Sequence, residues 1–376
     1  MDYEVIIVGA GSMGMAAGYY LAKQGKSVLL IDAGDPPHTD GSHHGETRII
    51  RHAYGEGEAY VDMALRAQAL WEELHDLSDE EIFIPTGVLN IGQSHSVFMQ
   101  NVIKSAKNYS LNVEKLSADE INQRWNGFHL PDSYMGCFEK DSGVLLSENV
   151  VSTYKKEACR HGAVMKVDSA VRSISILDNR VEVGVGKESF TANFLILTPG
   201  AGTRQILSLI DLELPLQEVR KTFSWFEADE CTYHSRNFPA FSFVLPDETY
   251  YGFPSVHEAG VKMGRHDGGQ LRDMRKPPET FGSYDEDWRD VINLARQFMP
   301  QVGQHKIGKV CTYTNTPDGD FIIDRHPNHD HVVIATGFSG HGFKFSSVVG
   351  EMLSQLVTGD GQPAFDISPF SLKRFE

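Results

Sequence analysis

The sequence has few cysteines and no long apolar segment. Four cysteines are spread over 376 residues, and no two of them are separated by only two residues. That spacing argues against a zinc site and against a disulfide framework. No run of about 18 apolar residues occurs, and no basic segment with an apolar core and a cleavage site precedes the first predicted strand. We therefore expect a cytoplasmic protein that has no membrane partner.

Positive charge is also in deficit. The chain has 34 Lys and Arg residues against 51 Asp and Glu residues, so its net charge is −17. This charge opposes binding to nucleic acid or to an anionic membrane, and an anionic substrate would need a local cluster of cations. His43, His44, His266 and His341 lack the spacing of a metal site, so we predict no metal. A chain of this length favours two lobes.

The first 32 residues contain a complete dinucleotide-binding pattern. We predict a strand over residues 5–8, a helix, and a second strand over residues 28–31 that ends at Asp32. The turn after the first strand reads Gly9-Ala10-Gly11-Ser12-Met13-Gly14. Its glycines permit a tight turn, close approach of a pyrophosphate and close packing of the helix. Asp32 lies where a carboxylate can accept hydrogen bonds from both hydroxyls of an adenosine ribose.

The patterns along the chain predict an α/β fold with an α+β second lobe. The predicted Rossmann-type dinucleotide-binding domain comprises residues 1–84, 142–216 and 305–376, and the predicted mixed-sheet substrate domain comprises residues 85–141 and 217–304. We expect the last helix of the second lobe to begin with a capping box formed by Ser283 and Glu286. Its expected apolar face is Trp288, Val291, Ala295 and Phe298.

Four cationic side chains and one cysteine are candidates for chemistry. Arg48 and Arg51 are three residues apart, Lys262 lies in a predicted strand, and Lys344 follows a glycine-rich loop. Arginine suits a carboxylate because its planar fork makes two charge-assisted hydrogen bonds. Taken alone, Cys311 reads as a small buried hydrophobe. It can instead attack the ring methyl of an oxidised flavin if nearby cations stabilise its thiolate.

Several longer motifs carry a family resemblance. Residues 41–57, 250–254, 311–318 and 337–345 resemble the monomeric sarcosine oxidase and N-methyltryptophan oxidase family. Residues 219–221, 262–270 and 366–370 look more like the N-methyltryptophan oxidase branch. The resemblance covers essentially the whole chain. It implies a D-amino-acid-oxidase-like two-domain architecture and a monomeric oxidase of N-methyl amino acids, which uses O2 and yields an amino acid, formaldehyde and hydrogen peroxide.

The resemblance also implies roles for individual residues. It implies FAD bound covalently through a thioether to Cys311, with further cofactor contacts from Gly340, Gly342 and Lys344. Arg51 and Lys344 would hold the substrate carboxylate, in a pocket lined by Tyr251, His266 and Tyr313. Lys262, near Arg48 and His44 on the other flavin face, would activate oxygen. Ser242 stands where sarcosine oxidases carry a methionine. Because serine is smaller, this difference favours a substrate with a larger side chain.

Three other functions share some of these features. A pyridine-nucleotide dehydrogenase would share the dinucleotide pattern but would be colourless and consume no oxygen. A related flavin oxidase acting on fructosyl or cyclic amino acids would share every site residue, so only a substrate panel separates it. A non-enzymatic flavin-binding redox sensor would have no need for two separate cationic sites.

Overall fold

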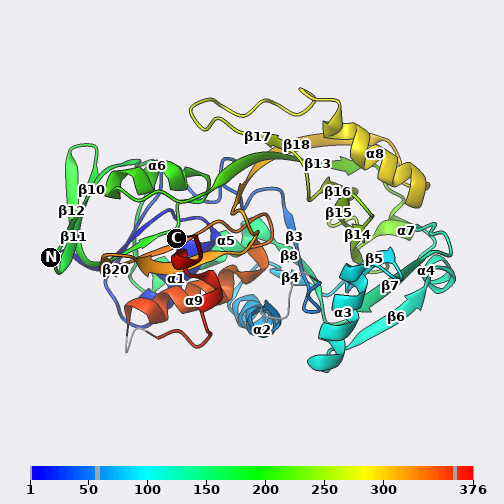
Figure 1. The fold of residues 1–376 in the computed structure, drawn as a ribbon, viewed down its shortest axis with the longest axis horizontal. Helices are drawn as coiled ribbons and strands as arrows, with labels where there is room; N and C mark the ends of the chain where they lie inside the picture. Colours follow the sequence, from blue (N-terminus) through cyan, green and yellow to red (C-terminus); the bar gives the residue numbers. More distant parts are fainter. Residues whose placement is uncertain (1, 56–59, 359–361, 376) are drawn as a thin grey trace.

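The computed structural model describes residues 2–55, 60–358 and 362–375. The strands form sheets of eight, nine and three strands, arranged in two halves that lie side by side (Figure 1). Within those residues no helix combines the length and the apolar character needed to cross a membrane.

The eight-stranded sheet has a parallel centre. Strand β1 (Tyr3–Val8) pairs in parallel with both β2 (Val28–Ile31) and β12 (Glu188–Leu197). Parallel pairing continues to β9 (Val164–Lys166) and β20 (His329–Thr336), and the antiparallel additions are β10 (Val171–Leu177), β11 (Arg180–Val185) and β19 (Ile322–His326). The predicted α/β fold of the first lobe is confirmed.

Strand β1 is apolar from Val5 to Val8 because both of its faces are buried there. Val5 and Ile7 join one apolar cluster, whereas Ile6 and Val8 join another on the opposite face. The first cluster includes residues of α1 (Ser12–Lys23), α2 (Val61–Leu77), α5 (Ser147–Arg160) and α9 (Ser346–Val357). The second includes residues of β10, β11 and α6 (Thr203–Leu207). The carboxyl end of β1 therefore delivers the Gly9 turn from a rigid, doubly covered strand.

The nine-stranded sheet forms the second half. Its strands are β5 (Val88–Gln93), β6 (Val113–Ser117), β7 (Tyr134–Glu139), β13 (Gln217–Phe226), β14 (Ala240–Val244), β15 (Thr249–Phe253), β16 (Val261–Arg265), β17 (Gln270–Leu271) and β18 (His305–Asn315). Only β5 and β14 pair in parallel, so the mixed sheet expected here is confirmed. Strand β18 pairs with β13 along its length, so the sheet includes residues that we had expected in the nucleotide-binding domain from residue 305 onward.

This sheet has one core face and one cavity face. Phe241 and Phe243 of β14 pack in a cluster with residues of α8 (Glu286–Phe298), whereas Ser242 between them points to the other side. The two faces follow from the period-two alternation of a strand. The face that carries Ser242 is therefore available to bound molecules.

The expected capping box of α8 is wrong. The N-cap is Asp285, and its side chain makes no capping hydrogen bond. Asp287, in the first turn of α8, instead accepts a hydrogen bond from the backbone N–H of Gly282 at 2.7 Å. This bond holds the loop that precedes the helix. Trp288 is 43% exposed and leaves the expected apolar face, whereas Val291, Ala295 and Phe298 are buried.

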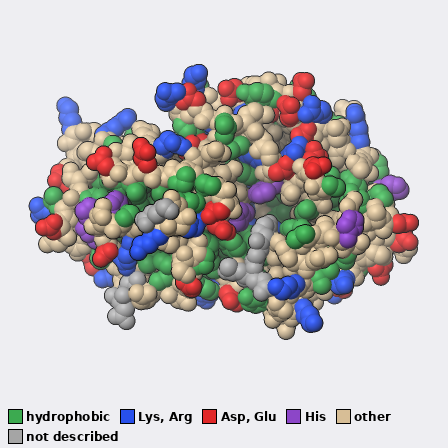
Figure 2. All heavy atoms as spheres, in the orientation of Figure 1, with side chains coloured by type: hydrophobic (Ala, Val, Ile, Leu, Met, Phe, Trp, Pro, Cys, Tyr) green, Lys and Arg blue, Asp and Glu red, His purple; other side chains and the backbone are tan. Residues whose placement is uncertain are grey.

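The remaining elements complete the two halves. A three-stranded sheet contains β3 (Thr47–Ile50), β4 (Phe83–Ile84) and β8 (Gly143–Leu146). The other α-helices in the described residues are α3 (Val97–Asn108), α4 (Ala118–Arg124) and α7 (Glu230–Tyr233). Figure 2 shows that acidic and basic side chains are interspersed over one face of the molecule. Hydrophobic side chains are spread across this face, and histidine side chains are visible near its middle and toward both of its ends.

Candidate active site

One cavity of about 530 Å³ joins the dinucleotide turn to the nine-stranded sheet. Most of the residues singled out from the sequence line it: Gly9, Gly11, Ser12, Met13, Asp32, Arg48, Arg51, Ser242, Tyr251, Lys262, His266, Cys311, Tyr313, Gly340, Gly342 and Lys344. Gly14 and His44 are not among its lining residues. Segments from both halves thus converge on a single space.

The glycine turn at one end of the cavity fits a pyrophosphate. Gly9 has a φ of 96°, and a Cβ there would overlap the carbonyl oxygen of Thr198. A Cβ on Gly14 would overlap the carbonyl oxygen of Gly9, so Gly14 packs the helix against the turn instead of facing the cavity. Gly11 is the N-cap of α1 and makes no side-chain capping bond. The first-turn N–H groups and the helix dipole therefore suit an anion in the cavity.

Asp32 lies at the same end of the cavity. Its carboxylate accepts hydrogen bonds from the backbone N–H groups of Ala10 at 2.7 Å and Gly34 at 3.0 Å. Burial opposes ionisation of Asp32, but hydrogen bonds from His38 and from these two N–H groups outweigh it and lower the pKa. An ionised carboxylate has about four acceptor sites, so one site remains for a ribose hydroxyl beside these three donors.

Cys311, the expected site of flavin attachment, lies on strand β18. Cys311 pairs in register with Lys221 of β13. Burial raises the pKa of the Cys311 thiol, while Arg48 and Lys221 oppose that rise. The cations expected from the sequence are present, but burial outweighs them. Burial also lowers the pKa of Lys221 to about 8.

Thr314 supports a polar occupant of the cavity. The residue lines the cavity, and its buried hydroxyl has no hydrogen-bond partner within the part of the chain that the structure describes. A buried hydroxyl without a partner is costly. The orphaned hydroxyl, the uncapped helix and Asp32 together match the donor and acceptor needs of FAD.

Lys344 and Arg51 converge on Tyr54. Lys344 Nζ donates to Tyr54 Oη and to the carbonyl oxygen of His341, both at 2.9 Å. The Arg51 guanidinium lies 4.6 Å from the centre of the Tyr54 ring, and its Nη1 donates to the carbonyl oxygen of Ala53 at 3.3 Å. Both cations are buried, so they can act on a carboxylate at low local dielectric.

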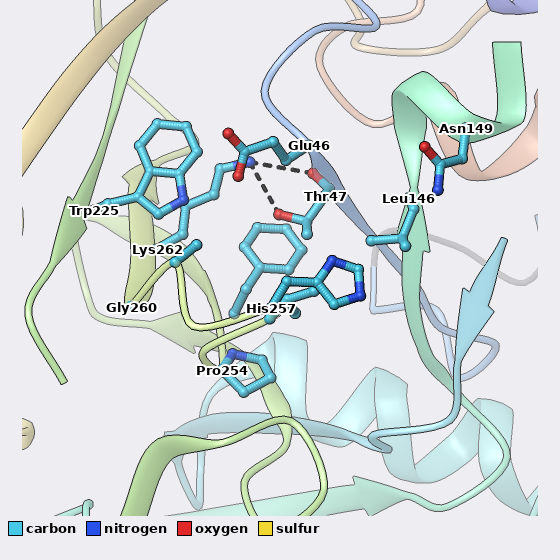
Figure 3. A pocket seen from close by; sticks show the side chains of 12 residues that line it. Glu46, Thr47, Leu146, Asn149, Trp225, Pro254, His257, Gly260 and Lys262 are labelled. Atoms are coloured by element: carbon cyan, nitrogen blue, oxygen red, sulfur yellow. Dashed lines mark hydrogen bonds between the residues drawn. The ribbon is translucent and has the colours of Figure 1, made fainter. Parts of the chain in front are cut away.

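Lys262 lies between two cavities. Its Nζ donates to Gly45 O at 2.5 Å, Thr47 O at 3.2 Å and Thr47 Oγ1 at 3.1 Å. Figure 3 shows the side chain directed at Thr47 beside Trp225. Lys262 also lines a second cavity of about 270 Å³, which reaches Glu46 and His257. Burial, helped by Arg48, lowers the pKa of Lys262 well below its ordinary value.

Of the two neighbouring histidines, His43 lines the cavity and His44 does not. His44 instead packs its ring against Phe223 at 5.7 Å. The carbonyl oxygen of His44 accepts a hydrogen bond from Arg48 Nη2 at 2.6 Å, so its contribution is to hold Arg48. Burial, with help from Arg48, lowers the pKa of His44 to about 4, which leaves the ring neutral at pH 7.

The aromatic wall depends on two glycines. A Cβ on Gly264 would lie 2.5 Å from Tyr251 Oη, and a Cβ on Gly340 would overlap the Tyr313 ring. Burial raises the pKa of both tyrosines, which therefore stay protonated at neutral pH. The His266 ring lies 5.7 Å from that of Tyr313. Other lining residues were not singled out from the sequence, among them Phe98, Phe223 and Met274.

Comparison with known proteins identifies the family to which this chain belongs. The model of the FAD dependent oxidoreductase family matches residues 4–356, and the chain belongs to that family. The chain is 48% identical over 375 residues to the monomeric sarcosine oxidase of Bacillus sp. (strain NS-129), covering 99% of this chain and 97% of that protein. It is 44% identical over 376 residues to the N-methyl-L-tryptophan oxidase of Citrobacter koseri, covering 100% of both.

Solved structures agree on the fold. L-proline dehydrogenase from P. horikoshii superposes with a TM-score of 0.86 at 19% identity, covering 100% of this chain and 98% of that one. The two-domain fold predicted from the sequence is confirmed. The closer resemblance to the N-methyltryptophan oxidase branch is not borne out by overall identity, which is 48% to sarcosine oxidases and 43–44% to N-methyl-L-tryptophan oxidases.

Proposed function

We propose that the protein is an FAD-dependent oxidase that demethylates N-methyl amino acids. The observation that carries this proposal is the single cavity that joins the FAD end to the buried cations Arg51 and Lys344. The overall reaction converts the N-methyl amino acid, O2 and water into the amino acid, formaldehyde and hydrogen peroxide. When bound, FAD would supply the two-electron oxidation of the amine, with O2 as the final acceptor.

Arg51 and Lys344 hold the substrate carboxylate in this proposal. Both are cationic and buried near Tyr54, so a bound carboxylate would be oriented from one side. Tyr251, His266 and Tyr313 line the space for the amine and its substituents. Cations around this space disfavour an ammonium and so favour the neutral amine, which can release electrons.

Lys262 and Arg48 serve the oxygen reaction. The Lys262 ammonium is held by three neutral oxygen acceptors, so its charge can stabilise negative charge that develops on O2. Arg48 is fixed by the carbonyl oxygens of Thr47 at 2.7 Å and Ser42 at 2.8 Å. Cys311 would hold FAD through a thioether, and Arg48 and Lys221 partly offset the burial that disfavours its thiolate.

Oxygen consumption tests the proposal. Sarcosine and N-methyl-L-tryptophan should each support oxygen uptake with one equivalent of peroxide and one of formaldehyde, whereas glycine and L-tryptophan should support none. Absence of uptake with every N-methyl amino acid, together with uptake on a fructosyl or cyclic amino acid, would assign the protein to that substrate class. A flavin that no amine reduces would favour the redox sensor.

We also propose that the enzyme works as a cytoplasmic monomer. The acidic net charge of −17 and the described helices, none of which suits a membrane, support this assignment. The Bacillus relative is named a monomeric enzyme. Light scattering of the purified holoenzyme should give a mass near 41.9 kDa, and twice that value would refute the monomer.

A further inference from the structure

A buried chain of three polar side chains ends at the cavity wall. Ser242 Oγ donates to Asn90 Oδ1 at 2.8 Å, and Asn90 Nδ2 donates to Glu139 Oε1 at 2.7 Å. The three residues lie on β14, β5 and β7, which are adjacent in the nine-stranded sheet. Asn90 and Glu139 are fully enclosed, with 0% and 2% exposed, and only Ser242 lines the cavity.

Glu139 sets the direction of every hydrogen bond in this chain. Its other oxygen accepts from the backbone N–H groups of His52 at 2.7 Å and Ala53 at 3.0 Å. An ionised carboxylate only accepts, so it requires the NH2 side of the Asn90 amide. The amide oxygen then faces Ser242, which must donate its only hydroxyl proton to it.

Ser242 is therefore committed as a donor within the protein. What its oxygen can still offer toward the cavity is acceptor capacity. Phe98 and Val244 also line the cavity, so part of the surrounding wall is apolar. A substrate N–H or O–H beside Ser242 can donate a hydrogen bond to its oxygen. A substrate group that only accepts hydrogen bonds finds no donor there.

We propose that Ser242 is a specificity-determining acceptor that selects N-methyl amino acids whose side chain carries a hydrogen-bond donor, and that Asn90 and Glu139 are the positioning residues that impose this polarity. The proposal rests on the proposed function and names its substrate class. The same carboxylate fixes the backbone that follows Arg51, so one buried charge positions both the acceptor and the carboxylate clamp.

The test compares two variants of equal size. Ser242→Thr keeps the hydroxyl and Ser242→Val replaces it by a methyl group, so both add the same bulk. Two substrate pairs exchange a donor-bearing group for an apolar one of similar size: the hydroxyl of N-methyl-L-serine for the methyl of N-methyl-L-2-aminobutyrate, and the indole N–H of N-methyl-L-tryptophan for the sulfur of its benzothienyl analogue. The wild type and Ser242→Thr should favour the donor-bearing member of at least one pair by about fivefold or more in kcat/KM, the factor expected for one neutral hydrogen bond. In Ser242→Val the ratio should approach one.

Binding supplies a readout that does not require turnover. Calorimetry of indole-3-acetate and benzothiophene-3-acetate should show the same preference in the wild type and in Ser242→Thr, and its loss in Ser242→Val. Asn90→Leu should also lower the kcat/KM ratio between the donor-bearing and the donor-free substrate. If Asn90→Leu does not fold, the threonine and valine variants alone decide.

The possible failures are distinguishable. Equal ratios in Ser242→Thr and Ser242→Val, or no donor preference in the wild type by kinetics or by calorimetry, would overturn the assignment of Ser242. If no N-methyl amino acid is oxidised while the calorimetric preference follows the hydroxyl, the acceptor role stands and the proposed function fails.

Discussion

Replacing Lys262 by methionine should separate the two half-reactions. Methionine keeps much of the side-chain volume but removes the charge that three oxygen atoms hold in place. If Lys262 acts on oxygen, the reductive half-reaction with substrate should stay close to the wild-type rate. The oxidative half-reaction should slow strongly.

The size of the effect follows from the setting of the charge. A unit charge about 4 Å from an ammonium is stabilised by about 4 kcal/mol at an effective dielectric constant of about 20. Lys262 is 2% exposed, so bulk water does not screen it directly. Since each 1.36 kcal/mol changes a rate about tenfold, reoxidation should slow by roughly a thousandfold.

The assay is stopped-flow spectroscopy, with anaerobic mixing for reduction and mixing with oxygenated buffer for reoxidation. Lys309→Met is the matched control, because Lys309 also lies over the Trp225 ring, at 4.8 Å, but is 39% exposed. That variant should reoxidise within about threefold of the wild type. Slow reduction combined with fast reoxidation in Lys262→Met would place Lys262 on the substrate side and refute the reasoning.

The pH dependence of the reoxidation rate should also identify the Lys262 ammonium as the active group. Burial lowers the pKa of Lys262, so its ammonium loses the proton at a lower pH than an ordinary lysine. Because the ammonium is the active form, wild-type reoxidation should slow as the pH rises through this lowered pKa. Lys262→Met should show no such step, and an unchanged step in the variant would assign it to another group.

Three further changes test other parts of the site and fold. After acid precipitation the wild-type pellet should stay yellow, whereas Cys311→Ala should release its flavin; colour in the wild-type supernatant would contradict the thioether. Lys344→Met should weaken carboxylate inhibitors about tenfold to a hundredfold in a titration of the flavin spectrum, since a charge-assisted hydrogen bond contributes about 1.5–3 kcal/mol, and unchanged affinity would remove Lys344 from the clamp. Asp287→Ala should lower the free energy of unfolding in urea by about 3–5 kcal/mol, because it leaves the buried Arg220 without its 2.6 Å ion pair, whereas a loss below about 1 kcal/mol would show that the pair is dispensable.

The nucleotide-binding end could be predicted because its determinants are local. The Gly9 turn, the helix that follows and Asp32 lie within one short segment, and Gly9 and Gly14 are required by the carbonyl oxygens of Thr198 and Gly9. Strand β1 is recognisable for the same reason, since burial on both faces makes Val5 to Val8 a continuous apolar run.

The parts that were missed depend on contacts between distant segments. The sheet that receives β18 is decided by pairing with β13, about ninety positions earlier in the sequence. The α8 cap was misassigned because Asp287 engages Arg220 and Gly282, which no local pattern encodes. His44 lies beside Arg48 as expected, but which of His43 and His44 lines the cavity depends on the path of the loop, which residue type does not encode.

The fold reconciles an acidic protein with a cationic cavity. The net charge is −17, yet Lys262 and Arg48 both line the cavity and are held by oxygen atoms of the loop around Gly45 and Thr47. Neither makes an ion pair with a carboxylate among the residues that the structure describes. Neutral carbonyl oxygens satisfy the hydrogen-bond donors of a cation without cancelling its charge, whereas a carboxylate would neutralise it. The positive potential is therefore kept for anionic groups that enter the cavity, and the acidic surface does not diminish it at short range.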